Sequence, residues 1–206
     1  MNKSFDTIKK FEQALASFTG YPYAIMTDSC THSLKMVFLY YQSSITQVRF
    51  TNETYISIPM MLKEIGIRYE YKFDDWFSRG EYQFEGSSVW DSARRLSRDM
   101  YIKNQTKCIS FGRDKPLSLS CGRGGAILTD DESLYELLIK CRYDGRDLTQ
   151  SPWHEQAKFP LGFHYNPQIE WAEEGLVKLK THKFTERITH YPDISKIIIE
   201  DWRNQT

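Results

Sequence analysis

Lys115 lies within the segment SFGRDKPLSLSCGRGG, residues 110–125, between an aspartate and a proline. This position fits neither a helix face nor a strand. One interpretation is a solvated lysine in a loop. In the other, the amine is held for attack on a carbonyl, which requires its unprotonated form. Partial burial near other cations, such as Arg113 or Arg123, favours that form.

A second segment, TDSCTHSLKM, places small hydroxyl side chains between a predicted strand and a predicted helix. The first N–H groups of a helix have no partner inside it, and the helix dipole favours an anion there, usually a phosphate. A plain helix cap by Ser29 or Thr31 is the alternative. Ser110 follows another predicted strand, and its hydroxyl could reach the same anion.

Two other side chains stand at predicted strand ends. Asp91, in VWDSARR, would need to be buried and to face a cation, such as a pyridinium nitrogen, to serve a site. A surface or capping aspartate is the alternative. Tyr55, in NETYIS, could stack on a flat ring, although an aromatic residue at this position is more often part of a core.

Hydrophobic spacing predicts the elements that position these residues. The predicted helices cover residues 4–18, 31–41, 56–65, 131–143 and 168–180, and the predicted strands cover 23–27, 47–50, 67–73, 87–91, 107–111 and 125–130. Residues 74–87 are predicted to be irregular. Strands that alternate with helices favour an α/β fold with a mostly parallel sheet and helices on both faces. Ligands bind at the carboxyl ends of such strands, where all four candidate positions fall.

The composition excludes several classes of function. The 206 residues carry 27 basic and 27 acidic side chains, which argues against a nucleic-acid binder. The four cysteines form no CxxC pair and no metal-ligand pattern, which indicates reduced thiols in the cytoplasm and no metal site. The N-terminus is charged and amphipathic, unlike a signal peptide, and no apolar run approaches the ~20 residues of a membrane span. No GxGxxG or GxxxxGK[ST] loop supports another kind of nucleotide-binding module.

Taken in order, the segments resemble the DegT/DnrJ/StrS family of sugar-nucleotide aminotransferases. YAIMTDSCTHSL is similar to the family's YAVAVSSGTAAL, TYISI to TYIST, and WDSAR to EDAAQ. SFGRDKPLSLSCGRGG is similar to SFxxxKxLxxGEGG, CRYDGR to LRNHGR, and GFHYNPQIEWAEEGLVKL to GYNYRMSDLQAAIGLVQL. The resemblance spans most of residues 11–180. It implies the aspartate-aminotransferase fold and the cofactor pyridoxal 5'-phosphate.

The resemblance also implies roles for individual residues. Lys115 would hold the cofactor as a Schiff base and move the proton between the substrate and the cofactor. Asp91 would keep the ring nitrogen protonated, and Tyr55 would stack on the ring. Arg94 stands where the family has the glutamine or histidine that contacts the region of the ring oxygen.

The phosphate would be bound by the backbone N–H groups of Cys30 and Thr31 and by the Ser110 hydroxyl. His164 matches a family asparagine that reaches the phosphate in the neighbouring subunit, which implies a homodimer with shared sites. Cys30 replaces a family glycine, so a Cβ in this tight turn is expected to crowd the anion or to change the backbone.

Other departures concern the loop that carries the lysine and the extent of the chain. Arg123 replaces a family glutamate, and Asn166 and Pro167 replace an arginine and a methionine. Family members are nearly twice as long. We therefore expect residues 1–180 to form the cofactor-binding large domain, shortened at its N-terminus, and residues 181–206 to be a remnant of the small domain or a tail. The small domain is expected to be largely missing.

The predicted function is transfer of an amino group from an amino acid, with glutamate as the expected donor, to a keto-sugar nucleotide. Lys115 favours this reaction over that of the family's dehydratase branch, in which a histidine replaces the lysine. The alternative is a non-catalytic cofactor-binding or assembly module that keeps the transferase fold. Cys30, Arg94 and the shortened chain favour this alternative.

Overall fold

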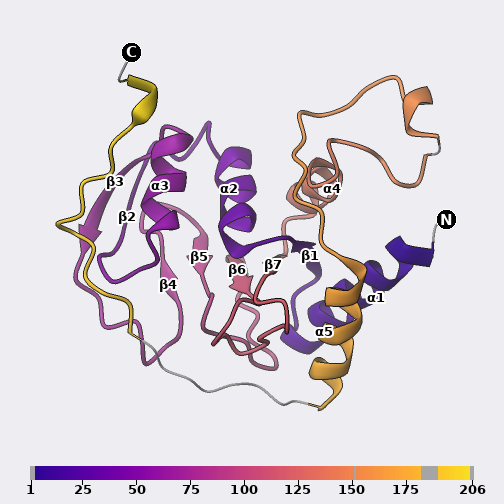
Figure 1. Cartoon of the computed structure of the whole chain (residues 1–206), viewed down its shortest axis with the longest axis horizontal. Coiled ribbons are helices and arrows are strands. Elements are labelled where there is room, and N and C mark those ends of the chain that lie inside the picture. Colours follow the sequence, from indigo (N-terminus) through magenta and orange to yellow (C-terminus); the bar gives the residue numbers. More distant parts are fainter. Residues whose placement is uncertain (1–2, 151, 182–189, 205–206) are drawn as a thin grey trace.

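A computed structural model describes residues 3–150, 152–181 and 190–204. The helices are α1 (Lys3–Thr19), α2 (Cys30–Tyr40), α3 (Ser57–Glu64), α4 (Glu132–Cys141) and α5 (Ile169–Thr181), with short 3₁₀ turns at η1 (Trp153–Glu155) and η2 (Trp202–Asn204). The strands are β1 (Tyr23–Thr27), β2 (Gln47–Thr51), β3 (Arg68–Lys72), β4 (Tyr82–Gln83), β5 (Val89–Asp91), β6 (Thr106–Ser110) and β7 (Gly125–Thr129). Figure 1 shows their arrangement. Every helix and strand predicted above is present, with ends shifted by about two residues at most.

The central sheet has the strand order β1-β7-β6-β5-β4, and β2 and β3 form a separate parallel pair. A bridge between Arg49 and Glu85 joins this pair to the segment that follows β4. β5 and β6 are parallel, whereas β7 is antiparallel to both of its neighbours and β4 is antiparallel to β5. The α/β class is confirmed, but the sheet is mixed rather than mostly parallel in its pairings. No helix separates β6 from β7, so no crossover connection makes them parallel.

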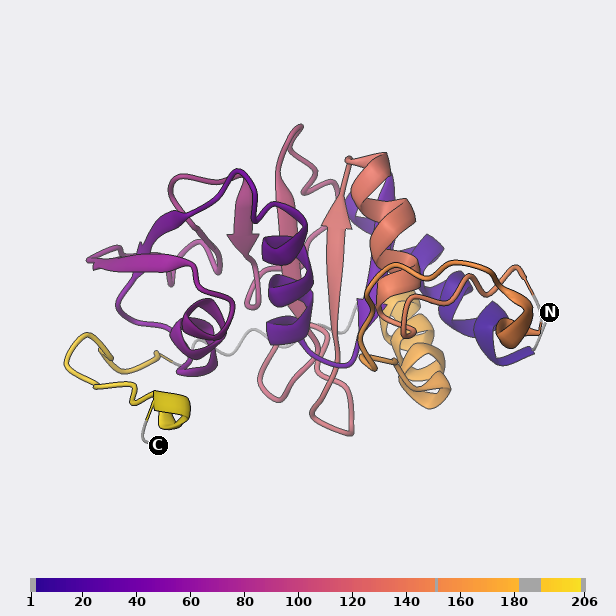
Figure 2. The same cartoon turned by 90° about the horizontal axis from the view of Figure 1, so that it is seen from above.

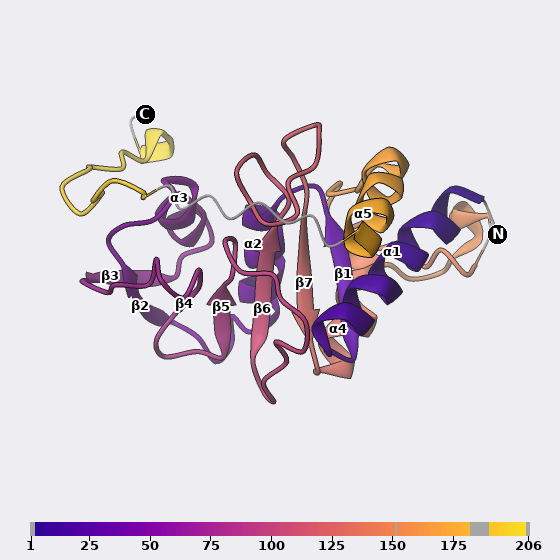
Figure 3. The same cartoon turned by 90° about the horizontal axis from the view of Figure 1, so that it is seen from below.

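Side chains that alternate along the strands form two cores, one on each face of the sheet. In β1, Ile25 packs into the core beneath α2, α3 and α4, whereas Ala24 and Met26 pack into the core beneath α1 and α5. Figures 2 and 3 show the helices on the two sides of the sheet. The predicted three-layer arrangement is therefore confirmed.

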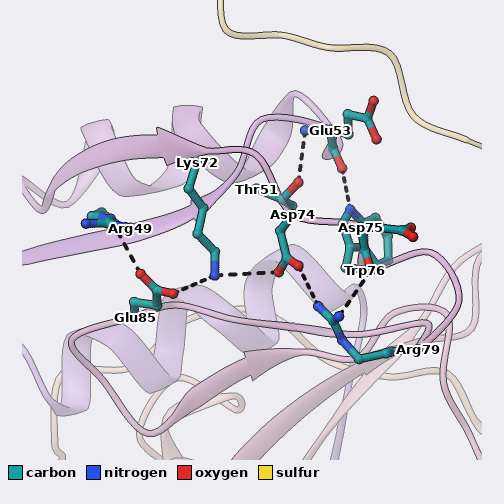
Figure 4. A network of polar contacts seen from close by, with 9 residues as sticks. All are labelled: Arg49, Thr51, Glu53, Lys72, Asp74, Asp75, Trp76, Arg79 and Glu85. Atoms are coloured by element: carbon teal, nitrogen blue, oxygen red, sulfur yellow. Dashed lines mark hydrogen bonds and ion pairs between the residues drawn. The ribbon is translucent and has the colours of Figure 1, made fainter.

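Residues 74–87, predicted to be irregular, contain the short strand β4 and bury Trp76 to 1% exposure. A polar network holds this segment against β2 and β3 (Figure 4). Lys72 Nζ lies 2.6 Å from Glu85 Oε1 and 3.5 Å from Asp74 Oδ2, and Arg79 donates to Asp74. The Trp76 indole donates to the Glu53 carbonyl at 2.9 Å. The network thus fixes the indole beside the loop that follows β2.

The ends of β1 and β6 meet the beginning of β7 at one edge of the sheet. Gly125, the first residue of β7, pairs with both Thr27 and Ser110. A Cβ at this glycine would lie 2.4 Å from the backbone nitrogen of Cys30. Only glycine lets β7 begin this close to the turn that starts α2. The close approach gathers the strand ends that carry the candidate residues.

Residues 190–204 pass the loop between β2 and α3 and then run beside α3 toward the C-terminal end (Figure 1). Ile194 is buried, and its N–H donates to the Asn52 carbonyl at 2.9 Å. Asp193 forms a bridge with Glu53. The predicted domain boundary near residue 180 stays a prediction. Among the described helices, none is long and apolar enough to cross a membrane.

Candidate functional site

A cavity of about 680 Å³ opens at this edge of the sheet. It is lined by nearly all of the residues predicted from the sequence: Cys30, Thr31, Tyr55, Asp91, Arg94, Ser110 and Lys115. The exception is His164, whose side chain is 76% exposed and whose Nδ1 lies 3.1 Å from Asp144 Oδ2, outside the cavity. Its predicted contact with a neighbouring subunit stays a prediction.

The N-terminus of α2 supplies donors for an anion. Ser29 caps the helix by accepting the His32 N–H at 3.1 Å. Within the described chain, the Thr31 N–H then has no hydrogen-bond partner, and both Cys30 and Thr31 line the cavity. Ser110 Oγ accepts from the Gly112 N–H at 3.2 Å and keeps its own hydrogen to donate. These groups can hold a phosphate.

Cys30 fits where the resemblance places a glycine. It is the first residue of α2 and does not have a positive φ, so its Cβ causes no backbone strain. The side chain packs against the core beneath α2, and burial raises the pKa of the thiol well above its usual value. The thiol is therefore a small core group, and the expected distortion of the turn does not occur.

Asp91 ends β5 with a carboxylate that is only 5% exposed. It accepts hydrogen bonds from the Tyr82 hydroxyl and the Ala93 N–H, each at 2.9 Å. No lysine or arginine of the described chain lies within ion-pair distance of it. Burial raises the pKa of Asp91, and the more distant charges of Lys115 and Arg94 oppose this shift. The cavity therefore contains a buried carboxylate without a bonded cation, as a pyridinium site requires.

Lys115 is 8% exposed, which excludes a solvated loop lysine. Its N–H donates to the Gly112 carbonyl at 3.3 Å, and Asp114 before it adopts a φ of 59°. This tight turn directs the side chain inward from the end of β6. The amine donates to the Tyr191 hydroxyl at 2.5 Å. Lys115 is thus held at the cavity wall by a neutral partner.

Aromatic side chains line the cavity beside the amine. Tyr191 stacks on Trp76 with ring centroids 6.2 Å apart, and its ring lies 6.1 Å from that of Tyr55. The guanidinium of Arg94 lies 4.9 Å from the Tyr191 ring centroid. Tyr55 is 57% exposed, so it is not a core residue and its ring is free to cover a ligand.

Sequence reasoning missed several residues of the site. Tyr82, whose hydroxyl also lies 2.7 Å from Thr54 Oγ1, orients Asp91. Trp76 could have been noticed as a large apolar residue in an acidic stretch. Tyr191 reaches Lys115 across 76 positions of sequence, and no local pattern indicates such a contact.

A buried lysine, a buried aspartate and a free helix N-terminus lie at one edge of a three-layer α/β fold. Together they define the class of protein, the large domain of the aspartate-aminotransferase fold. Residues 101–195 match the DegT/DnrJ/EryC1/StrS aminotransferase family, which confirms the resemblance seen in the sequence. No curated protein matches the chain.

Solved structures similar to the chain share its fold. A DegT DnrJ EryC1 StrS aminotransferase from Brucella abortus has a TM-score of 0.65 and 16% identity, with 85% of this chain and 59% of that chain covered. An aminotransferase from Psychrobacter cryohalolentis has a TM-score of 0.65 and 18% identity, covering 85% and 56%. Helicobacter pylori PseC, an aminotransferase involved in pseudoaminic acid biosynthesis, has a TM-score of 0.64 and 18% identity, covering 85% and 58%. The chain therefore spans less than two thirds of the length of each of these proteins.

Proposed function

We propose that the protein binds pyridoxal 5'-phosphate through Lys115 and transfers an amino group from an amino acid to a keto-sugar nucleotide. One observation carries the proposal: Lys115 and Asp91 line a single cavity, and neither forms an ion pair within the described chain. The amine, the carboxylate and the N-terminus of α2 match the aldehyde, the ring nitrogen and the phosphate of this cofactor.

Each residue would have a defined task. The cofactor supplies a ring that withdraws electrons from the reacting carbon. Lys115 would hold it covalently and move a proton at its Nζ. Asp91 would keep a proton on the ring nitrogen, a task suited to a buried carboxylate fixed by Tyr82. Tyr55 would cover the ring.

The phosphate would be bound by the N–H groups of Cys30 and Thr31 and by the Ser110 hydroxyl. Arg94 adds a cation to the cavity wall beside the amine. These donors all come from strand and helix ends that the sheet holds in place. The site can therefore be formed before any ligand binds.

The substrate class is proposed from similar structures. These include a GDP-4-keto-6-deoxymannose-3-dehydratase with a trapped PLP-glutamate geminal diamine and an NtdA from Bacillus subtilis with the cofactor PMP. On this basis glutamate is the proposed amino donor and a keto-sugar nucleotide the acceptor. A homodimer in which His164 completes the neighbouring site belongs to the same proposal.

Absorption spectra test the proposal. The purified chain mixed with pyridoxal 5'-phosphate should absorb in the near-ultraviolet to blue, and glutamate should bleach this band as the amino group is taken up. A keto-sugar nucleotide should then restore the band. A band that no amino donor changes would favour the non-catalytic module. No band at all would contradict both functions.

A further inference from the structure

Tyr191 makes the one hydrogen bond that Lys115 Nζ has within the described chain. The hydroxyl oxygen lies 2.5 Å from Nζ, whereas Nζ lies 5.1 Å from the ring centroid. The phenol therefore points its oxygen, rather than the face of its ring, at the amine. Asp91 acts on Lys115 only from a distance, because no ion pair forms between the two.

The backbone that carries Tyr191 is attached to the loop after β2. Two and three residues further on, Asp193 bridges to Glu53 and the Ile194 N–H donates to Asn52. The Tyr191 ring stacks on Trp76, and the same Glu53 accepts the indole N–H through its carbonyl. The hydroxyl is thus held at the amine from two sides, by backbone contacts and by ring stacking.

We propose that Tyr191 is the acid–base residue that serves Lys115 when its amine condenses with a carbonyl. The inference rests on the proposed role of Lys115 as a carbonyl-binding amine. During condensation a nitrogen–carbon bond forms and the carbonyl oxygen leaves as water. That oxygen must gain two hydrogens, and the amine must lose two.

Tyr191 is placed to carry both hydrogens. In the addition step, the Tyr191 oxygen accepts a proton from the nitrogen while its own proton passes to the carbonyl oxygen. In the dehydration step, the same exchange passes a second proton to that oxygen, which leaves as water. The two amine hydrogens end in the released water, and the phenol is unchanged. Proton transfer of this kind by a positioned side chain typically contributes about 10²- to 10⁴-fold to a rate. Removing the hydroxyl should therefore slow imine formation clearly.

Two reactions at the same lysine separate this role from a structural one. The full chain without cofactor is treated with propanal and cyanoborohydride, which traps the imine, or with an acetylating ester, whose reaction forms no imine and loses no carbonyl oxygen as water. Mass spectrometry measures both products on the peptide that contains Lys115. The variants are Tyr191→Phe, which keeps the ring, and Tyr69→Phe, which makes the same change on β3, outside the cavity.

Tyr191→Phe should slow imine trapping at Lys115 by at least about tenfold and should not slow acetylation, while Tyr69→Phe should leave both rates within about twofold of the wild type. Equal changes in the two reactions, or an unchanged imine rate, would overturn the proposal. Faster imine trapping would also overturn it, because Tyr191 would then be an obstacle.

The proposed function can fail separately from this inference. Propanal requires no phosphate site and no carboxylate partner for a ring. If pyridoxal 5'-phosphate forms no adduct with the wild type while Tyr191→Phe still slows propanal trapping alone, the proposed function is contradicted and the role of Tyr191 stands.

Discussion

Lys107 and Lys115 are both buried, but their amines have different partners. The Lys107 side chain is fully buried, and its amine lies 2.9 Å from each carboxylate oxygen of Glu81. Burial lowers the pKa of Lys107, and Glu81 opposes this shift. Among the described residues, the Lys115 amine has only the Tyr191 hydroxyl as a hydrogen-bond partner.

The acidic side chains show the same contrast. Glu12 pairs with the buried Arg142 behind β1, and Glu81 pairs with Lys107 and Arg95. Asp91 is equally buried, but its partners in the described part of the chain are a hydroxyl and an N–H. A buried charge that meets its opposite within the chain stabilises the fold, whereas one left without an opposite charge is available to a ligand. Lys115 and Asp91 line the cavity without an ion-pair partner among the described residues.

The largest expected effect comes from breaking a matched pair. Glu81→Ala should lower the free energy of unfolding by roughly 3–5 kcal/mol, because Lys107 would stay buried without its carboxylate. Urea denaturation measures this loss. Glu64→Ala removes the carboxylate of the Lys35–Glu64 pair, in which Glu64 is 53% exposed, and should cost less than about 1 kcal/mol. Similar losses in the two variants would contradict the distinction.

The same substitution at the two lysines sharpens the comparison. Lys107→Met should cost about 2 kcal/mol, because Glu81 loses two hydrogen bonds from a cation inside the sheet. Lys115→Met should change stability by less than about 1 kcal/mol, because it removes one hydrogen bond to a partly buried phenol. Thermal and urea unfolding of both variants give the difference. If Lys115→Met proved the more damaging change, the lysine would be structural.

The smallest expected effect is a gain in stability. Asp91→Asn should raise the free energy of unfolding of the cofactor-free protein by about 1 kcal/mol at neutral pH, since it removes a buried charge without an ion-pair partner. In a chain of this length this corresponds to roughly 2–4 °C in Tm. The same variant should lose the ability to protonate the cofactor ring.

The pH dependence of this gain has a definite sign. Burial raises the pKa of Asp91 in the folded state. The protonated carboxyl therefore contributes its full stabilisation to the wild type below the unfolded pKa of about 3.9, and this stabilisation is lost as the pH rises through the folded pKa. The advantage of Asp91→Asn should therefore vanish in acid and grow toward neutral pH. Calorimetry across this range measures it, and an advantage that grew in acid would contradict an unmatched carboxylate.

Local patterns were sufficient to predict most of the helices and strands and most of the candidate residues that line the cavity. Alternating strands and helices place Asp91 and Ser110 at strand ends, and the helix after β1 places Cys30 and Thr31 at its first turn. These predictions succeed because each depends on a few neighbouring residues and on a general rule about strand ends.

What the sequence did not predict depends on contacts between distant segments. The Glu81–Lys107 pair spans 26 positions and the Lys115–Tyr191 contact spans 76. β4 has two residues and little intrinsic signal, so its pairing with β5 decides that it is a strand. The antiparallel direction of β7 follows from the loop before it, which contains no crossover helix.

Mapping a reduced adduct tests the central claim most directly. The chain is incubated with pyridoxal 5'-phosphate, reduced with borohydride, digested and analysed by mass spectrometry, with Lys115→Met as the control. At a substoichiometric amount of cofactor, the adduct should be found on Lys115 in the wild type. The Lys115→Met control should carry no adduct under the same conditions. An adduct on Lys107 or on a surface lysine instead, with Lys115 unmodified, would contradict this account.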